Sequence, residues 1–424
     1  MKATLLVAAA AAVVAAAGSP PLPSAQVTPI AIRSAPAARL PGFAAELSQQ
    51  PVIQGPGAWA IIPEEKAWAA LARAGVDTRQ AARWAYARSL LGRGFSADAF
   101  GVLQVMGQDD PDLALIDSYR LARGAALAGM GRSADAIEAL VGPGLAANPE
   151  ACAWRLLVLA KEKLSREALQ QLACAEPALK VRPLADRAPF LLAAAGAALH
   201  AGKPDLTIRW LRPLARSNPA ADLLRGRAHQ ALGQNQDARL ALSRAIKNGN
   251  FEQRLDAEVS EIEAAVQARS MPPAQALKRL QHIRYVWRGG EVEERALRLS
   301  YRLSSAIGDL RTALSAGSAL FSYFNLGADG GQVMAGLQKQ LGAAIDPASR
   351  MPLDQALGLY WDFRHLTPMG AEGDLLVSRL GERLQAAGLY ARAADLFEHQ
   401  LFARAKDLAQ GPLSAKVARL HILA

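Results

Sequence analysis

The sequence predicts an all-α protein, built as an α-solenoid of about ten antiparallel helix pairs stacked side by side. Two observations carry this prediction: repeats at a spacing of about 34 residues from residue 64 onward, and a lack of strand patterning. The chain has 424 residues, of which 51% are hydrophobic and 20% charged, so it is too apolar for a disordered protein. Its two cysteines exclude a disulfide-dense scaffold and a cysteine-rich zinc module.

The first 25 residues have the pattern of a secretory signal peptide. Met1 and Lys2 give a positive start, and an apolar run follows from Leu5 to Ala17. Cleavage is expected after Ala17 or Ala25. The run is too short to span a bilayer, so no transmembrane anchor is expected, and a buried N-terminal helix is the alternative. The sequence therefore predicts export to the periplasm.

Residues 26–63 are predicted to be a proline-rich linker or an extended arm with no fold of its own. Nine prolines lie within residues 18–63, and helices do not run through such a density of proline. Removing the signal peptide takes away one lysine and no acid, so the net charge falls from +10 to +9. In an exported protein this charge points to anionic glycan or lipid, or to no specific partner, and no nucleic acid partner is expected.

The repeats are clearest where residues 121–140 align with residues 223–242 without a gap, identical at nine of 20 positions. A third copy covers residues 380–397. Each copy has a small residue in a first helix, a glycine that ends this helix, an alanine early in the second helix and a large apolar residue beyond it. Small residues on both helices let an antiparallel pair approach closely, and the glycine forms the turn. In order, these residues are Gly124, Gly131, Ala136 and Leu140; Gly226, Gly233, Ala238 and Leu242; and Gly381, Gly388, Ala393 and Phe397.

With these residues the sequence resembles the tetratricopeptide (TPR) repeat family, whose pattern is about 34 residues long. Residues 381, 388, 393 and 397 follow the pattern fully. Two gaps between turns, of 75 and 80 residues, each have room for one further pair. Residues 64–424 are therefore predicted to form about ten pairs, with another type of α-solenoid or an irregular helical bundle as alternatives. Weaker copies place turns at Gly94, Lys163, Gly202 and Gly308.

Residues 352–374 also resemble a block in a group of exported repeat proteins of Gram-negative bacteria that have no assigned activity. In that group the chain continues beyond this point. Here residues 413–424 are expected to be the first helix of an incomplete last pair, either because the sequence is truncated or because this helix caps the solenoid.

The two cysteines are candidates for a disulfide. In the repeat register Cys152 lies near the start of a first helix and Cys174 near the end of its partner. Antiparallel helices bring these ends together, so the Cα separation could fall within the ~4.4–6.8 Å that a disulfide requires. Export would provide oxidising conditions. The alternative is two buried thiols that pack as small apolar residues.

The candidate binding residues lie in the basic stretch 278–302. Arg295, Arg298 and Arg302 share one face of a helix at i, i+3 and i+7. The TPR resemblance places that face in the concave groove, where the three arginines would form a carboxylate-binding clamp. Glu291 and Glu294 lie four residues before Arg295 and Arg298, so a partly neutralised, solvated face is the favoured alternative.

Three arginines of this stretch lack so obvious a carboxylate partner: Arg284, Arg288 and Arg302. They are the favoured positions for an anionic ligand.

No catalytic constellation is present in the sequence. The six histidines are scattered and no HExxH motif occurs, so no metal site is expected. No GxSxG or SxxK motif offers an activated serine, and no cofactor is predicted. The sequence therefore predicts a non-catalytic, exported scaffold or adaptor that binds a protein partner in the cell envelope. The alternatives are the non-catalytic superhelix of a cell-wall lytic enzyme and a protein that binds anionic glycan or lipid.

Overall fold

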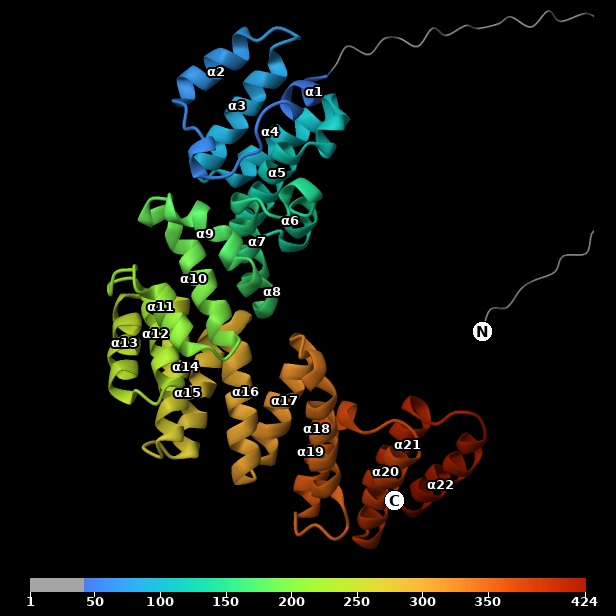
Figure 1. Cartoon of the computed structure of the whole chain (residues 1–424). Coiled ribbons are helices and arrows are strands. Elements are labelled where there is room, and N and C mark those ends of the chain that lie inside the picture. The colour runs from blue at the N-terminus through green and yellow to red at the C-terminus, as the bar shows by residue number, and fades with distance from the viewer. Residues whose placement is uncertain (1–41) are drawn as a thin grey trace, which may run out of the picture.

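The computed structural model describes residues 42–424, so the expected signal peptide at 1–25 lies outside the described residues. Twenty-two α-helices and six short 3-10 helices make up the described chain, with no strand among them. Figure 1 shows the helices following one another along a hooked superhelix. The predicted all-α solenoid is confirmed.

Nine antiparallel pairs form the solenoid over the described residues. Four more helices, α1 (Phe43–Ser48), α2 (Glu64–Arg73), α9 (Leu172–Lys180) and α22 (Gln410–Leu423), lie outside the pairs. In chain order the pairs are α3 (Arg79–Gly92) with α4 (Ser96–Asp109), α5 (Asp117–Gly129) with α6 (Ser133–Ala139), α7 (Pro149–Lys161) with α8 (Ser165–Gln170), α10 (Leu184–His200) with α11 (Pro204–Leu211), α12 (Pro219–Ala231) with α13 (Asn235–Asn248), α14 (Phe251–Gln267) with α15 (Pro273–Val286), α16 (Gly290–Ile307) with α17 (Leu310–Tyr323), α18 (Gly330–Ile345) with α19 (Leu353–Phe363), and α20 (Ala371–Ala386) with α21 (Tyr390–Ala403).

All seven residues predicted to form turns between paired helices have a positive φ. Six are glycines, for which this conformation carries no steric cost. The seventh, Lys163, has a φ of 59°, which L-residues other than glycine rarely adopt. Arg269, with a φ of 54°, forms the turn of α14 and α15 in the first sequence gap, where no glycine marks it. The pair α18 and α19 occupies the second gap.

The conserved spacing between glycine and large apolar residue has a packing reason. A Cβ added to Gly381 would lie 2.3 Å from the Phe397 ring, well inside contact distance. Gly124 and Gly226 stand in the same way against Leu140 and Leu242, at 2.5 and 2.6 Å. The large residue therefore fills the space over the glycine within one pair.

The structure joins Cys152 and Cys174 in a disulfide, with Cα atoms 5.8 Å apart. Cys174 lies on α9, because the second helix of this pair is interrupted at Gln171 and continues as a separate helix. The repeat pattern had placed Cys174 near the end of a single partner helix. The bond fixes α9 against the start of α7, and Cys152 itself is fully buried.

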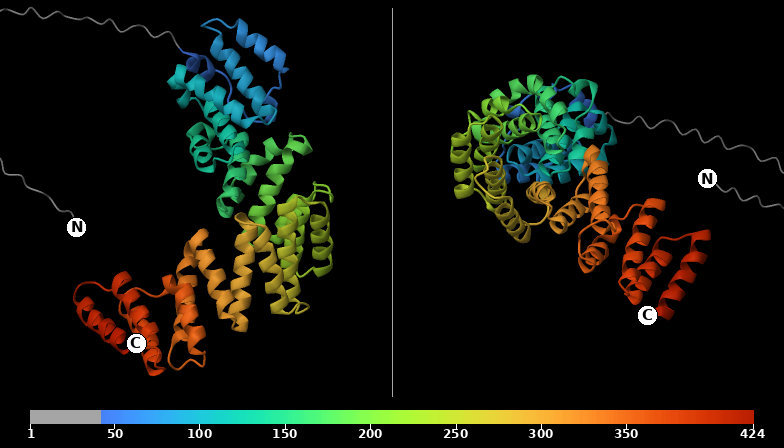
Figure 2. Two further views of the ribbon diagram at one scale, coloured as in Figure 1. Left: turned by 180° about the vertical axis from the view of Figure 1, so that it is seen from behind. Right: turned by 90° about the horizontal axis from the view of Figure 1, so that it is seen from below.

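The core is distributed along the superhelix as successive apolar clusters, as expected where each pair packs on its neighbours. Seen from below, the helices up to α16 curve into a ring, and α20 to α22 project away from it (Figure 2). None of the described helices combines the length and apolar character that a membrane crossing requires.

Residues 42–63, here called the N-terminal arm, pack against the first three pairs and contain the short helix α1. Four of its apolar residues are buried in the core of these pairs: Ala44, Leu47, Ile53 and Trp59. Neither the helix nor this burial was predicted, because the density of prolines favoured an arm with no fold of its own.

Candidate functional site

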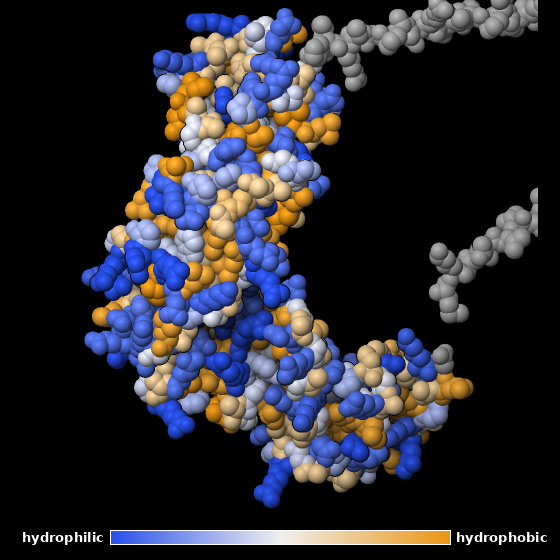
Figure 3. Space-filling model, viewed as in Figure 1, coloured by the Kyte–Doolittle hydropathy of each residue, from blue (hydrophilic) through white to orange (hydrophobic). Residues whose placement is uncertain are grey.

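A groove at the centre of the superhelix encloses a volume of about 890 Å³. The first helices α10, α12, α14 and α16 and the turn before α8 form its walls. Figure 3 shows it as a hollow lined by hydrophilic residues. We call it the central groove. Its charged lining residues are Lys163, Arg166, Glu167, His200, Arg227, Glu263, Glu291, Glu294, Arg295 and Arg298.

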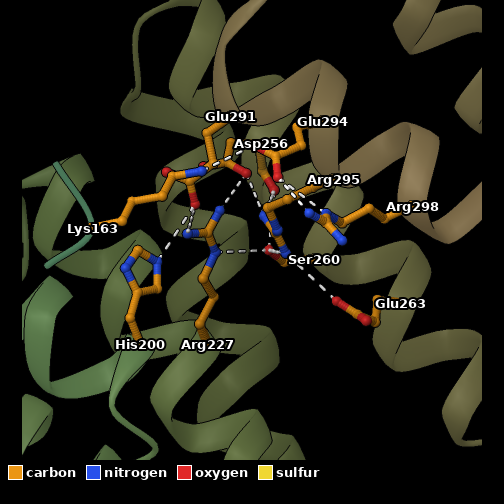
Figure 4. Close-up of polar contacts among 10 residues, drawn as sticks. All are labelled: Lys163, His200, Arg227, Asp256, Ser260, Glu263, Glu291, Glu294, Arg295 and Arg298. Carbon is orange, nitrogen blue, oxygen red and sulfur yellow. Dashed lines mark hydrogen bonds and ion pairs between the residues drawn. The ribbon is translucent and has the colours of Figure 1, made fainter. Parts of the chain in front are cut away.

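Asp256 on α14 binds two of the arginines that line the groove. Both Arg227 of α12 and Arg295 of α16 donate hydrogen bonds to its Oδ1 atom (Figure 4). The same two guanidinium groups donate to the hydroxyl of Ser260, at 3.3 and 3.1 Å. Asp256 is 7% exposed, and a buried carboxylate of this kind requires charged partners. Three consecutive first helices are thereby tied together.

Glu291, at the start of α16, extends the network toward α10. Its Oε1 atom lies 3.2 Å from Arg227 Nη1 and 3.9 Å from His200 Nε2, the latter an ion-pair distance too long for a hydrogen bond. The interaction with the His200 ring, followed by the charges of Arg227 and Arg295, lowers the pKa of Glu291 to about 2, against burial, which raises it. Glu291 is therefore ionised at neutral pH.

Glu294 of α16 connects the network to the turn between α7 and α8. It accepts hydrogen bonds from Lys163 Nζ at 2.9 Å and from Arg298 Nε at 3.0 Å. Lys163 belongs to the turn between α7 and α8, and three complete pairs separate this turn from α16. The contact therefore spans the superhelix, from one side of the groove to the other.

Only two of the five arginines predicted as binding residues line the central groove. Arg295 and Arg298 line the central groove. Arg302 lies on the same helix and pairs with Glu263 at 2.9 Å. Arg284 and Arg288 are not among the lining residues. Arg284 lies on α15 and Arg288 in the loop that follows it.

The ion pairs differ from those that the sequence suggested. Glu294 and Arg298 pair within α16 as expected, but Arg295 turns away from Glu291 to Asp256 and Glu263. Arg302 and Arg288, which lacked an obvious partner, pair with Glu263 and Glu293, the latter at 2.9 Å. These partners come from a neighbouring helix or from a spacing of five residues, so the i, i+4 rule does not reveal them.

Arg284 is the exception among the five, because it makes no ion pair within residues 42–424. Its Nε atom is buried without a hydrogen-bond partner. Burial, with Arg288 nearby, lowers the pKa of Arg284, while Glu293 raises it. It remains the one arginine of the predicted set without a carboxylate partner in the described structure.

Six of the ten residues drawn in Figure 4 were not predicted from the sequence: Lys163, His200, Arg227, Asp256, Ser260 and Glu263. The repeat register contains the signal for several of them. Asp256 and Arg295 each lie 13 residues before their turn residues, Arg269 and Gly308. The turn at Arg269 carries no glycine, so this register could not be assigned from sequence.

Comparison with known proteins gives a distant match to one kind of solved structure and no named relative. No protein-family model and no curated protein matches the chain. Among solved structures, the crystal structure of the TPR domain of P58(IPK) aligns over 81% of this chain and 98% of its own, with 15% sequence identity and a TM-score of 0.23. The described helix pairs and their turns themselves define a solenoid of TPR-like antiparallel pairs.

Proposed function

We propose that this protein is an exported, non-catalytic scaffold that holds a segment of a protein partner of the cell envelope in the central groove. The observation that carries the proposal is the groove itself, a concave cavity of about 890 Å³ walled by consecutive first helices. Concave surfaces of stacked helix pairs suit extended partners, since each pair adds one further strip of contact.

The lining favours a partner that carries charges of both signs. Arg227, Arg295 and Arg298 each already have a carboxylate partner. A segment with both basic and acidic side chains can exchange these pairs for its own without leaving a charge unpaired. A polyanion offers no replacement for the cations that Glu291 and Glu294 would lose, so anionic glycan or lipid is the less favoured ligand.

The test is site-specific photo-crosslinking in intact cells of the host. A photoreactive residue replaces Gln267, which lines the groove, and a matched variant carries it at Leu240, which is 53% exposed on α13. We expect one envelope protein to be captured repeatedly from position 267 and not from position 240. Capture of cell-wall fragments or lipid without protein, or equal capture from both positions, would contradict the proposal.

A further inference from the structure

The repeat register shows which residues of a first helix face the groove. Counting back from each turn residue, Arg295 lies at position 13, Arg298 at position 10, Arg227 at position 6 and His200 at position 2. All four line the central groove. Since the pairs repeat one geometry, the same positions of α3, α5 and α7 belong to the continuation of this concave face.

In the first three pairs several of these positions are covered. Glu150 of α7 and Ser118 of α5 lie at position 13, and Ala125 of α5 lies at position 6. They are 0%, 2% and 0% exposed. Ala125 belongs to the same apolar cluster as Ile53 and Trp59 of the N-terminal arm. Part of the concave face is therefore covered at its N-terminal end, where Ala125 packs in the cluster of the N-terminal arm.

The hydrogen bonds identify the arm as the occupant. The indole of Trp59 donates to Glu150 Oε1 at 2.8 Å. The backbone N–H of Ile62 donates to Ser89 Oγ on α3, also at 2.8 Å. At position 2 of α3, a Cβ added to Gly92 would lie 2.4 Å from the carbonyl oxygen of Trp59, so the arm backbone touches this helix directly.

The Glu150 carboxylate that accepts the Trp59 indole is itself held in place by other side chains of the described structure. It also accepts hydrogen bonds from Arg182, which is 4% exposed, and from the Trp154 indole at 2.9 Å. Asn148, the N-cap of α7, donates from Nδ2 to the Ile53 carbonyl at 2.8 Å. A buried carboxylate that accepts an indole N–H and a side-chain amide that binds backbone are elements of a peptide-binding site.

We propose that the concave face of α3, α5 and α7 is a second binding site, for an extended, proline-containing segment that directs an indole to Glu150, with residues 52–62 as its resident ligand. This site is separate from the central groove and does not depend on the function proposed for it. Residues 52–62 belong to the same chain, so their effective concentration at the site is on the order of millimolar. A competing segment therefore binds only where the binding of residues 52–62 has been weakened.

The test measures binding of a fluorescent synthetic peptide of residues 49–63 to the full chain by anisotropy. In one variant, Ile53→Asp with Trp59→Asp, two charges in the apolar core expel the resident. We expect the peptide to bind this variant at least about tenfold more tightly than the wild type. A control peptide with Trp59→Ala should bind the same variant at least about tenfold more weakly than the parent peptide.

Equal affinity of the peptide for variant and wild type would overturn the proposal, as would equal affinity of the two peptides. If the double variant loses its helical circular dichroism, the same titrations use Trp59→Ala alone, which keeps Ile53 in place. Sedimentation of the wild type tests whether residues 52–62 of a second copy of the chain occupy the site instead. A monomer supports a resident from the same chain, whereas a dimer abolished by Trp59→Ala would assign the segment to a second copy and overturn the proposal.

Discussion

Lys163 Nζ lies 2.9 Å from Glu294 Oε2, although 131 residues separate the two in the chain. In an open solenoid, each pair contacts only its neighbours. This contact joins the turn after α7 to α16 across three intervening pairs, so the central turn of the superhelix is closed on itself. The central groove is bounded on two sides by the same ion-pair network.

A double-mutant cycle of Lys163→Ala and Glu294→Ala should measure the strength of this closure. The Lys163 side chain is 55% exposed, so we expect a coupling free energy of about 0.2–1 kcal/mol at low salt. The coupling should decrease as salt screens the pair. Chemical denaturation at two salt concentrations measures the coupling. A second cycle, of Arg302→Ala and Glu263→Ala, gives the coupling of an ion pair between the nearby helices α14 and α16 for comparison. Coupling that does not change with salt would contradict an electrostatic closure.

Gly381→Ala should lower stability, although alanine is the better helix former by about 1 kcal/mol. The added methyl group would stand 2.3 Å from the Phe397 ring, and overpacking of this kind costs about 1–3 kcal/mol. Gly196→Ala on α10 is the matched control, because no atom lies within 4 Å of its Cβ position. We expect thermal unfolding to show a lower midpoint for Gly381→Ala and an unchanged or higher one for Gly196→Ala. A stabilised Gly381→Ala variant would refute the packing argument.

Replacing Cys152 and Cys174 with serine should lower the free energy of unfolding by about 3 kcal/mol, the loop-closure contribution expected for a bond that spans 22 residues. Urea denaturation with and without reductant measures the effect. The reductant should destabilise the wild type and leave the double variant unchanged. A reductant effect of equal size on both proteins would show that the disulfide is not its origin.

Glu291 should make the protein sensitive to acid below about pH 4.5. Its folded pKa of about 2 lies below its ordinary value of 4.5, so the unfolded state binds more protons between these values. The stability that this group contributes is present above pH 4.5 and is lost as the pH falls toward 2. Glu291→Gln should flatten the dependence of the unfolding midpoint on pH within this window. The control is Glu138→Gln, a change at an exposed glutamate on α6 outside the central groove. An unchanged slope would contradict the assignment.

The sequence predicted the repeating part of this structure and not the exceptions to it. Gly131, Gly233 and Gly388 end their helices because glycine alone adopts a positive φ without steric cost, and such a signal is local. Arg269 makes the same turn without that signal, since packing of the surrounding helices overrides the local preference.

The candidate site was harder to predict for a related reason. Arg295, Arg298 and Arg302 share a face of one helix, which the 3.6-residue period reveals. Their partners Asp256 and Glu263 lie on the preceding first helix, and Lys163 lies several pairs away. Contacts of this kind depend on the curvature of the superhelix, which is the sum of small rotations between pairs and leaves no motif in the sequence.

The pairing of Lys163 with Glu294 restricts how a protein of this design can change over evolution. Repeat proteins commonly lengthen or shorten by duplicating or losing whole units, because the neighbours of a lost unit can stack on each other. Here the gain or loss of a single pair between α8 and α16 would rotate Glu294 out of reach of Lys163 and open the wall of the groove. We expect the number of units within this segment to be fixed by selection, while the number beyond α16 is free to vary.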